Sequence, residues 1–460
     1  MKYKTNNFTI NGDNSLSTKG NMSFSVTEEV EQIEINFQVN HTAWIQIFIK
    51  KDDKIIGESL LTHKQNERTI LVGKDSHLSS PTVTPQTSLL GRWDLVYIAK
   101  PHFKESCDVV VTVIENLTGV IDSESENDIL KDSFQNKSGW VKGDFHTHTH
   151  LSDGEMSRTE NLTSAKNQNL DFFFSTEHNV IIRSWPKNDD VMVFPGVELT
   201  SDKLGHCNYL GVTRSFFSVQ EYEDMSEELG MQEIIRQNQD NGILSINHPY
   251  LEPWEWNADI PVKMITSLEL INDPTYKDNN EATKKAFGLW TRMWNEGLKV
   301  TGIGGSDSHL RPNDFYPESK TPSLIGDPGT YVHVDILNIN SVLEAVKKGH
   351  TKVSRIGEIH LKSKDYPNLL PGQKLSSLVR HFEIKLPLNA VEYQIDWIFD
   401  GQILKTELTS NQSIIQIDEI DEHFHWLRAD IRDSHEIVAT FNPVYWNDKK
   451  IEITMLKEIL

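Results

Sequence analysis

The sequence has little of several features that mark common classes of protein. It contains only two cysteines in 460 residues, Cys107 and Cys207, so no disulfide framework and no cysteine-rich metal cluster is expected. Its 45 lysines and arginines are outnumbered by 67 acidic residues, and the net charge of −22 argues against nucleic acid as a general ligand. No apolar run approaches the roughly 20 residues that span a membrane, and the polar N-terminus shows no signal peptide. These absences favour a cytoplasmic protein that binds neither nucleic acid nor a membrane.

The chain is long enough for several domains. Near the N-terminus Ile33, Ile35, Phe37 and Val39 alternate with polar residues, and many such strands without helical patterning suggest a sandwich. The same alternation of apolar and polar residues occurs near the C-terminus. The acidic stretch over 121–139 resembles a linker with one short helix. We therefore expect four parts: a β-sandwich over 1–120, a linker over 121–139, an α/β domain over 140–355 and a β module over 356–460.

The central part combines short apolar runs with helical patterns. A helical spacing is kept by Ala286, Leu289, Trp290, Met293 and Trp294. Gly297 follows as a stop signal. A second helix is predicted from the capping-box pattern Ser341-Val342-Leu343-Glu344, with Gly349 at its end. Strands that alternate with helices are typical of a (β/α) barrel whose active site lies at the carboxyl-end rim.

A histidine-rich segment, Gly143-Asp144-Phe145-His146-Thr147-His148-Thr149-His150-Leu151-Ser152-Asp153-Gly154, comes after the linker. Alternate side chains of a strand share a face, so His146 and His148 can reach one metal ion, and Asp153 adds an oxygen ligand. An H-x-H pattern alone is more often a solvated strand face or a core histidine. The prediction of a metal site therefore depends on the segments further along the chain.

Further apolar runs lead to histidine, aspartate or glutamate in the same way. The candidate ligands after the first segment are His178, Glu198, His206, His248, Asp307 and His309. Together with His146, His148 and Asp153 they make six histidines and three carboxylates, a donor set that suits Zn²⁺, Mn²⁺ or Fe²⁺. No P-loop and no Ser-His-Asp nucleophile pattern is present, so we expect metal-bound hydroxide as the attacking group. Cys207, beside His206, is expected to be a buried strand residue instead of a ligand.

These segments resemble the motifs of the PHP (polymerase and histidinol phosphatase) superfamily of metallohydrolases. The order H-x-H-x4-D-G, T-E-H-N, G-x-E, G-H, H-P and D-x-H occurs once between Trp140 and Arg355. The resemblance implies a distorted (β/α)7 barrel, here between an N-terminal β-sandwich and a C-terminal β module, with two or three divalent metal ions. His150 falls where the family varies, which favours a supporting or exposed role.

The resemblance also implies how the ligands divide among the ions. The first ion would be held by His146, His148, Glu198 and Asp307, the second by Glu198, His206 and His248, and the third by Asp153, His178 and His309. Glu198, Asp307 and His309 are expected to be catalytic. Asn179, the last residue of the T-E-H-N motif, and Arg183, which follows that motif closely, are candidates for binding the substrate.

The flanking β segments are similar to those of the CehA/McbA-type branch of the superfamily. His350 and Lys352 depart from that branch's usual Gly-Arg-Thr-hydrophobic-Val-Thr segment, which puts a shared substrate in doubt. We expect a phosphoesterase that acts on a small-molecule phosphate ester. Two alternatives stay open: a carbamate, ester or amide hydrolase that uses the same metal site, and a non-catalytic binding protein on the same scaffold.

Overall fold

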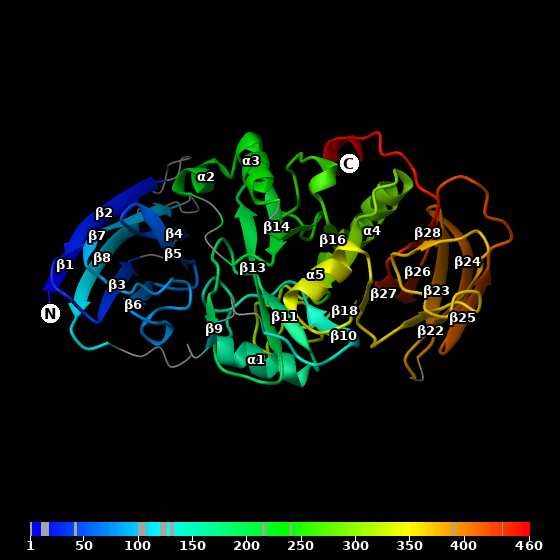
Figure 1. Cartoon of the computed structure of the whole chain (residues 1–460), viewed down its shortest axis with the longest axis horizontal. Helices are drawn as coiled ribbons and strands as arrows, with labels where there is room; N and C mark the ends of the chain where they lie inside the picture. The colour runs from blue at the N-terminus through cyan, green and yellow to red at the C-terminus, as the bar shows by residue number, and fades with distance from the viewer. Residues whose placement is uncertain are drawn as a thin grey trace.

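The computed structural model places three parts of the chain in a row, which Figure 1 shows from blue through green to orange. It describes residues 2–10, 18–40, 44–99, 107–119, 127–128, 133–213, 216, 218–239, 242–388, 391–434 and 436–460. The linker predicted over 121–139 lies partly outside them, and its described residues include the short strand β9 (Asn127–Asp128) and no helix. None of the described helices is long and apolar enough to cross a membrane.

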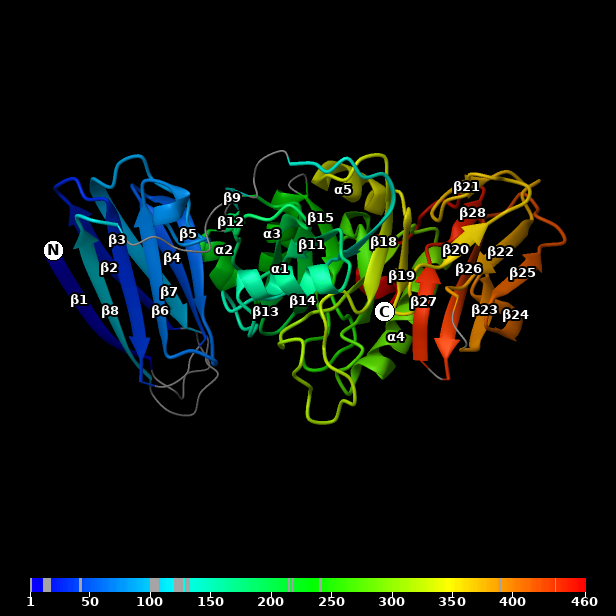
Figure 2. The ribbon, with the colours of Figure 1, turned by 90° about the horizontal axis from the view of Figure 1, so that it is seen from below.

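The N-terminal part is formed by two four-stranded antiparallel sheets that face each other (Figure 2). The first consists, in spatial order, of β1 (Lys2–Ile10), β8 (Cys107–Asn116), β3 (Gln32–Val39) and β6 (Glu67–Gly73). The second consists of β2 (Thr18–Val26), β7 (Gly91–Ala99), β4 (Ile45–Lys51) and β5 (Lys54–Leu61), and the 3-10 helix η1 (Ser76–Leu78) follows β6. Ile33, Ile35, Phe37 and Val39 are all buried between the sheets, so the predicted alternation is confirmed.

The central part contains seven strands in one curved sheet. Their spatial order is β17 (Thr301–Gly305), β16 (Ser267–Asn272), β15 (Ile243–Ile246), β14 (Gly205–Leu210), β13 (Met192–Ser201), β11 (Phe172–Ser175) and β10 (Gly139–Asp144). Neighbouring strands are parallel except at β14, which is antiparallel to both neighbours. Just beyond β10 and β17, Thr147 and Ser308 form a single parallel bridge. The first and last strands therefore approach at one end, while no continuous ladder joins them among the described residues.

The helices of the central part pack around this sheet. They are α1 (Arg158–Asn167), α2 (Val219–Asp224), α3 (Glu228–Asn238), α4 (Asn279–Asn295), α5 (Ile339–Lys347) and the 3-10 helix η2 (Val262–Met264). The predicted stripe of α4 is buried, and Gly297 follows that helix with φ +81°, as expected for a stop. The predicted capping box of α5 is wrong. Asn338 caps this helix by accepting a hydrogen bond from the Ser341 amide, because the first turn begins earlier than the sequence pattern indicates.

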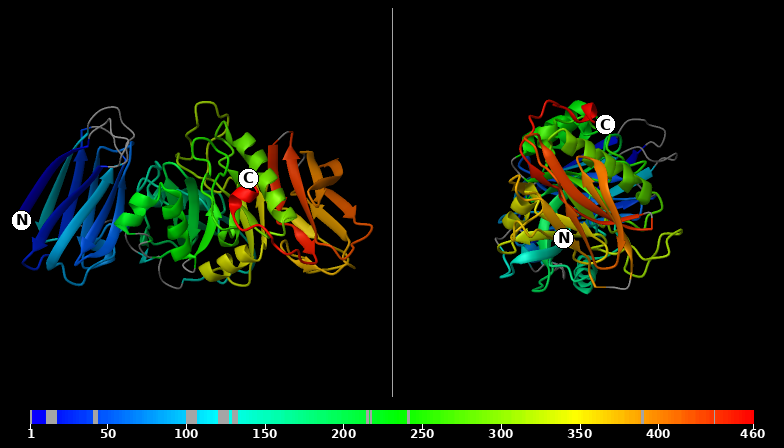
Figure 3. Two further views of the ribbon diagram at one scale, coloured as in Figure 1. Left: turned by 90° about the horizontal axis from the view of Figure 1, so that it is seen from above. Right: turned by 90° about the vertical axis from the view of Figure 1, so that its right-hand side faces the viewer.

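The sheet continues from the central part into the C-terminal part. From β10 it runs through β18 (Gly329–Val334), β19 (Thr351–Ser354), β27 (Glu436–Phe441), β26 (His425–Asp433), β23 (Tyr393–Phe399) and β24 (Gln402–Thr409). At its side lie β28 (Val444–Trp446) and β21 (Lys374–Leu375), and a separate sheet holds β20 (His360–Lys362), β22 (His381–Lys385) and β25 (Gln412–Gln416). The tail returns to the central part, where Leu456 of η3 (Leu456–Glu458) is buried (Figure 3). The C-terminal β segments therefore share both sheet and core with the central part.

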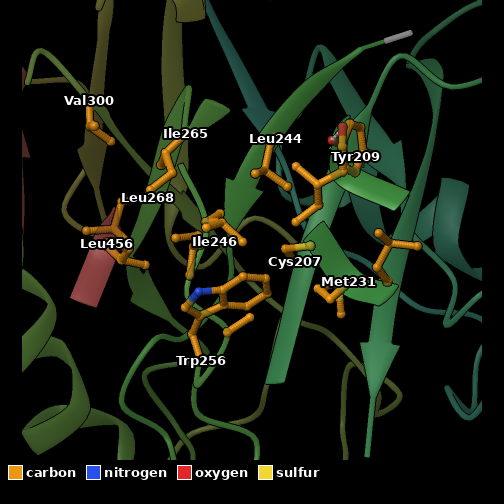
Figure 4. Close-up of a cluster of buried hydrophobic side chains, with 14 of the residues drawn as sticks. Cys207, Tyr209, Met231, Leu244, Ile246, Trp256, Ile265, Leu268, Val300 and Leu456 are labelled. Carbon is orange, nitrogen blue, oxygen red and sulfur yellow. Dashed lines mark hydrogen bonds between the residues drawn. The ribbon is translucent and has the colours of Figure 1, made fainter. Parts of the chain in front are cut away.

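The largest core lies behind the strands that carry the histidines. Cys207 is packed there among apolar side chains that include Ile246 and Trp256, as Figure 4 shows. Cys207 is free and fully buried, as expected for a small core residue on a strand. The core holds β13, β14 and β15 together and so fixes where their polar residues lie.

Polar contacts and an apolar contact attach the N-terminal part to the central part. Arg183, which follows β11, donates a hydrogen bond from Nη2 to Glu58 Oε2 at 2.9 Å, and its Nη1 donates to the Thr82 carbonyl. Both side chains of the pair are buried. Phe48 of β4 packs edge-on against Tyr222 of α2, with ring centroids 5.6 Å apart. Arg183 is thus a docking residue, and its predicted role in substrate binding is wrong because its guanidinium points into this interface.

Replacing Arg183 by alanine should destabilise the protein strongly. The Glu58 carboxylate would then be buried without its partner, which typically costs about 3–5 kcal/mol. Urea unfolding followed by circular dichroism measures this cost. The exposed pair of Lys166 and Asp190 provides the control, since Lys166→Ala should cost less than about 1 kcal/mol. Equal effects of Arg183→Ala and Lys166→Ala would contradict the docking role.

Candidate metal centre

The nine predicted ligands meet at one edge of the central sheet. His146 and His148 follow β10, His178 follows β11, and Glu198 lies within β13. The others arrive by the same route: Asp153 in the loop between β10 and α1, His248 after β15, and Asp307 and His309 after β17. His206 differs, because it stands at the beginning of β14, and the antiparallel direction of that strand brings its first residues to this edge. The expectation that each ligand stands at the carboxyl end of its strand therefore fails at His206, and Glu198 also lies inside its strand, although both residues reach the site.

Glu198 is the centre of this arrangement. Its carboxylate is fully buried, and Asn247 Nδ2 donates a hydrogen bond to Oε1 at 2.9 Å. Its two oxygens lie between 2.8 and 3.5 Å from ring nitrogens of His146, His148, His178, His206 and His248. One carboxylate thus touches five imidazoles, which suits an oxygen ligand shared between ions.

Two further carboxylates complete the cluster. Asp307 Oδ1 lies 3.3 Å from His146 Nε2 and 3.0 Å from His148 Nε2. Asp153 Oδ1 lies 3.3 Å from His178 Nε2 and 3.1 Å from His309 Nε2. Each of these two carboxylate oxygens therefore faces at least two imidazoles.

The donor atoms fit divalent metal ions. Buried atoms without a hydrogen-bond partner include His146 Nε2, His148 Nε2, Asp153 Oδ1, Glu198 Oε2 and Asp307 Oδ1. Buried polar atoms are almost always hydrogen-bonded, so several unpartnered ones facing one another indicate a position for an ion. Three groups have donor atoms close enough to hold one ion each: His148, Asp153, His178 and His309; His146, His148 and Glu198; and His178, Glu198 and His206. His148 and His178 thus each belong to two groups, whereas the family resemblance assigned each of them to one ion.

Two further side chains, Glu269 and Thr200, orient these ligands, and the sequence motifs did not include either of them. Glu269 of β16 accepts the His248 amide at 2.8 Å and lies 3.1 Å from His146 Nδ1. Thr200 Oγ1 lies 2.6 Å from His178 Nδ1. Such partners fix the orientation and basicity of a ligating imidazole. Glu269 stands between the apolar residues Leu268 and Leu270, and a lone carboxylate in an otherwise apolar strand is the sequence signal that could have identified it.

Burial and charge act in opposite directions on the titratable groups. Burial disfavours the charged form of Glu198, but the surrounding histidines outweigh it and hold the pKa of this carboxyl well below its usual range. Burial also opposes the charge on His309, but Asp153 and Asp307 outweigh it and raise the pKa of His309 to about 9. At His206 burial prevails and lowers the pKa to about 4, so this ring is neutral and available as a ligand.

Three residues at the site have left-handed backbone conformations without being glycine. The φ angles are +54° at Asn179, +24° at His248 and +49° at Asp307. Each such residue costs of the order of 1–3 kcal/mol and persists only where its surroundings fix it. Asn179 is fixed by exchanging two hydrogen bonds of 3.0 Å with the backbone of Thr200. Its side chain holds the loop that carries His178, so the predicted substrate contact of Asn179 is wrong.

The cluster opens into a pocket of about 560 Å³. Asp153, His178, His206, His248, Asp307 and His309 line its floor. Its walls include Trp254, Tyr276 and Tyr316 from the central part and Trp44 from the N-terminal part. Neither Arg183 nor Asn179 is among the lining residues. His150 also lies elsewhere, with its Nδ1 3.3 Å from the Met156 carbonyl, in line with the supporting or exposed role expected for it.

Comparison with known proteins adds solved structures of low similarity. No family model and no curated protein matches the sequence. One solved structure, a two-domain protein of Bacteroides vulgatus containing a predicted PHP-like metal-dependent phosphoesterase, is 15% identical and covers 70% of this chain and 99% of its own, with a TM-score of 0.38. Bacteroides uniformis β-glucuronidase is 9% identical, with 95% and 75% covered and a TM-score of 0.20. The CBM51-2 and INT domains of Clostridium perfringens ZmpB are 7% identical, with 93% and 72% covered and a TM-score of 0.14. At such TM-scores these likenesses carry no argument about the fold or the site.

Substituting the shared carboxylate should remove more metal than substituting a single histidine. Glu198→Gln takes a charge from a group that touches five imidazoles, whereas His206→Ala removes one donor. We expect Glu198→Gln to lower the metal content per chain more than His206→Ala, as measured by elemental analysis of dialysed protein. His150→Ala is the matched control, because His150 belongs to the histidine-rich segment but not to the cluster. This variant should keep its full metal content. Full metal content in Glu198→Gln would contradict a shared ligand.

Metal affinity should rise with pH. His309 holds a proton in the folded metal-free protein up to a pKa of about 9, above its ordinary value of 6.5, and an incoming ion must displace that proton. The pairing of protonated His309 with Asp153 stabilises the metal-free fold fully below pH 6.5, and this contribution is lost as pH rises through about 9. Chelator competition at a series of pH values should give an apparent affinity that increases up to about pH 9. An affinity that falls over that interval would contradict this assignment.

Proposed function

We propose that this protein is a metal-dependent hydrolase of the PHP type, and specifically a phosphoesterase for a small-molecule ester. The observation that carries the proposal is Glu198, a fully buried carboxylate in contact with five imidazoles. Three of these imidazoles, those of His178, His206 and His248, line an open pocket. A structural site is closed by its protein ligands, whereas a catalytic site keeps a face open to substrate. This cluster has such a face.

The residues of the chain would hold two or three divalent ions, with Zn²⁺, Mn²⁺ and Fe²⁺ as the candidates by donor type. When bound, such ions supply an activated water and compensate negative charge on the substrate. Asp202 and Asp273 also line the pocket, and Glu269 contacts His146, so acidic groups surround the cluster. An anionic group such as a phosphate would therefore be held by direct contact with the ions, whose own charge dominates the local field.

Glu198, Asp307 and His309 are the residues to which we assign catalytic roles. Glu198 would hold the ions together with the histidines that surround it. Asp307 and His309 line the pocket, with His309 Nδ1 3.5 Å from Asp307 Oδ1, where both can reach a substrate oxygen. Asn272 Nδ2 donates to the other Asp307 oxygen at 3.4 Å and restrains its orientation.

The family branch is inferred from the flanking segments. We propose that the chain is of the CehA/McbA type, and an N-terminal β part and C-terminal β segments on either side of the central sheet support this proposal. Lys352 stands at a position where that branch usually has a hydrophobic residue. Its side chain is buried, donates a hydrogen bond to Glu358 Oε1 at 2.8 Å, and has its ammonium nitrogen 3.7 Å from the centroid of the Trp140 ring. Its pKa is lowered to about 8 by burial, and it does not line the pocket. It therefore has no part in our account of substrate binding.

Two other functions are compatible with the same cluster. A carbamate, ester or amide hydrolase would use the same floor, with attack on carbon instead of phosphorus. A binding protein would keep the fold without turnover. We favour an enzyme because all nine candidate ligands are present together, whereas a site that has lost its function is expected to lose ligands one at a time. The cytoplasm is the location we propose, from the sequence alone.

Paired substrates test the proposed reaction. Metal-loaded protein should hydrolyse aryl phosphates faster than aryl carbamates and carboxylic esters with the same leaving group. Asp307→Ala should reduce this turnover by at least about 100-fold, because it removes a residue of the metal cluster itself. Steady-state kinetics with each metal provide the measurement. Efficient carbamate turnover without phosphate turnover would contradict the phosphoesterase and leave the metal centre in place, and no turnover of any of these esters would favour the binding protein.

A further inference from the structure

The N-terminal part supplies one wall of the pocket. Trp44, just before β4, and His63 and Lys64, just after β5, line it together with the metal-ligand candidates. The Trp44 ring packs edge-on against the His178 ring, with centroids 5.5 Å apart. Residues of the β-sandwich therefore form part of the surface that a ligand in the pocket would contact.

This wall is held against the loop that carries the first ligands. Gln65 Nε2 donates to the His150 carbonyl at 2.8 Å. Arg68 Nη2 donates to the carbonyls of His150 and Leu151, each at 3.1 Å. These carbonyls lie between His148 and Asp153 in the sequence, so the hydrogen bonds fix the segment around Lys64 relative to the cluster.

Lys64 is the only lysine or arginine among the described residues that line the pocket. Its side chain is exposed, and no ion pair engages its ammonium group in the described part of the chain. The arginines near the ligand segments are engaged elsewhere: Arg183 with Glu58, Arg158 with the Ser184 carbonyl, and Arg311 with Glu155. Lys64 is therefore the available cation for an anionic substrate group.

Aromatic side chains of the central part stand around the same pocket. Trp254 and Tyr276 have ring centroids 6.1 Å apart, and Tyr276 and Tyr316 have centroids 5.3 Å apart. Trp254 is 41% exposed, which leaves much of its surface free to contact a ligand. Contiguous aromatic surface beside a few polar groups is typical of a site that binds an organic molecule.

We propose that Lys64 of the N-terminal β-sandwich binds the phosphate of the substrate above the metal cluster, while a flat apolar group of the same molecule packs on Trp254, Tyr276 and Tyr316. The inference rests on the proposed phosphoesterase function and specifies its substrate class, a phosphate ester of an aromatic or similarly flat alcohol. The anion-binding role that the sequence suggested for Arg183 would thus belong to Lys64, which lies 119 positions earlier in the chain.

Inorganic phosphate is the probe for this role. Its dissociation constant for metal-loaded protein can be measured by calorimetry in the wild type, Lys64→Ala, Lys64→Arg and Lys54→Ala. Lys64→Ala should weaken phosphate binding about tenfold or more, as for the loss of a hydrogen bond between charged groups. Lys64→Arg should largely keep the affinity, and Lys54→Ala should not change it, since Lys54 is an exposed lysine of the same sheet that does not line the pocket. Metal content should be equal in all four proteins.

The outcomes separate this inference from the proposed function. If the wild type binds phosphate and Lys64→Ala binds it equally well, the role of Lys64 is wrong and the phosphoesterase stands. If metal-loaded wild type does not bind phosphate at all, both are wrong. Aryl phosphate kinetics give the second readout: Lys64→Ala should raise KM for an aryl phosphate but not for the uncharged aryl ester. An equal change in both would point to a structural effect and contradict recognition of the anion.

Discussion

The contact between one buried carboxylate and the histidines around it is the constraint on which the rest of the site depends. A carboxylate such as Glu198, withdrawn from water, is tolerated only when positive charge compensates it. Five imidazoles surround it, and burial keeps at least one of them, His206, neutral at ordinary pH. Despite burial, the neighbouring carboxylates raise the pKa of His146 and of His178, so protons on these two rings can provide part of the compensation in the metal-free protein, and divalent ions would provide it more completely. The geometry thus supports the metal chemistry that we propose.

The fold brings these groups together from distant places in the sequence. Six parallel strands and one antiparallel strand direct their polar residues to one edge of the sheet, and the apolar core around Cys207 fixes the strands. The N-terminal sandwich then closes one side, through the buried pair of Arg183 and Glu58 and the hydrogen bonds from Arg68. The C-terminal segments extend the central sheet and return a buried tail residue, Leu456, to its core. The three parts are therefore joined by packing as well as by the chain.

Sequence patterns correctly predicted the features that depend on the geometry of a single strand or helix. The alternation of β3 and the stripe of α4 follow from the periods of strands and helices. His146 and His148 lie just beyond β10, on either side of the bridge at Thr147, and both contact Glu198 as the spacing predicted. Arg183 and Asn179 were misinterpreted because their neighbours in space, Glu58 and Thr200, cannot be inferred from spacing along the chain. Lys64 was missed for the same reason, and the continuity of the C-terminal sheet depends on the pairing of β19 with β27, which local patterns do not encode. Glu269 differs from these residues, because a lone carboxylate between apolar strand residues is visible in the sequence itself.

Anomalous X-ray diffraction from crystals of metal-loaded protein tests the central claim most directly. Data collected on either side of the absorption edge of the bound metal locate each ion without reference to activity. The account predicts at least two anomalous peaks, one on each side of the Glu198 carboxylate, within bonding distance of the surrounding histidines. A single peak away from Glu198, or none in fully loaded protein, would contradict it.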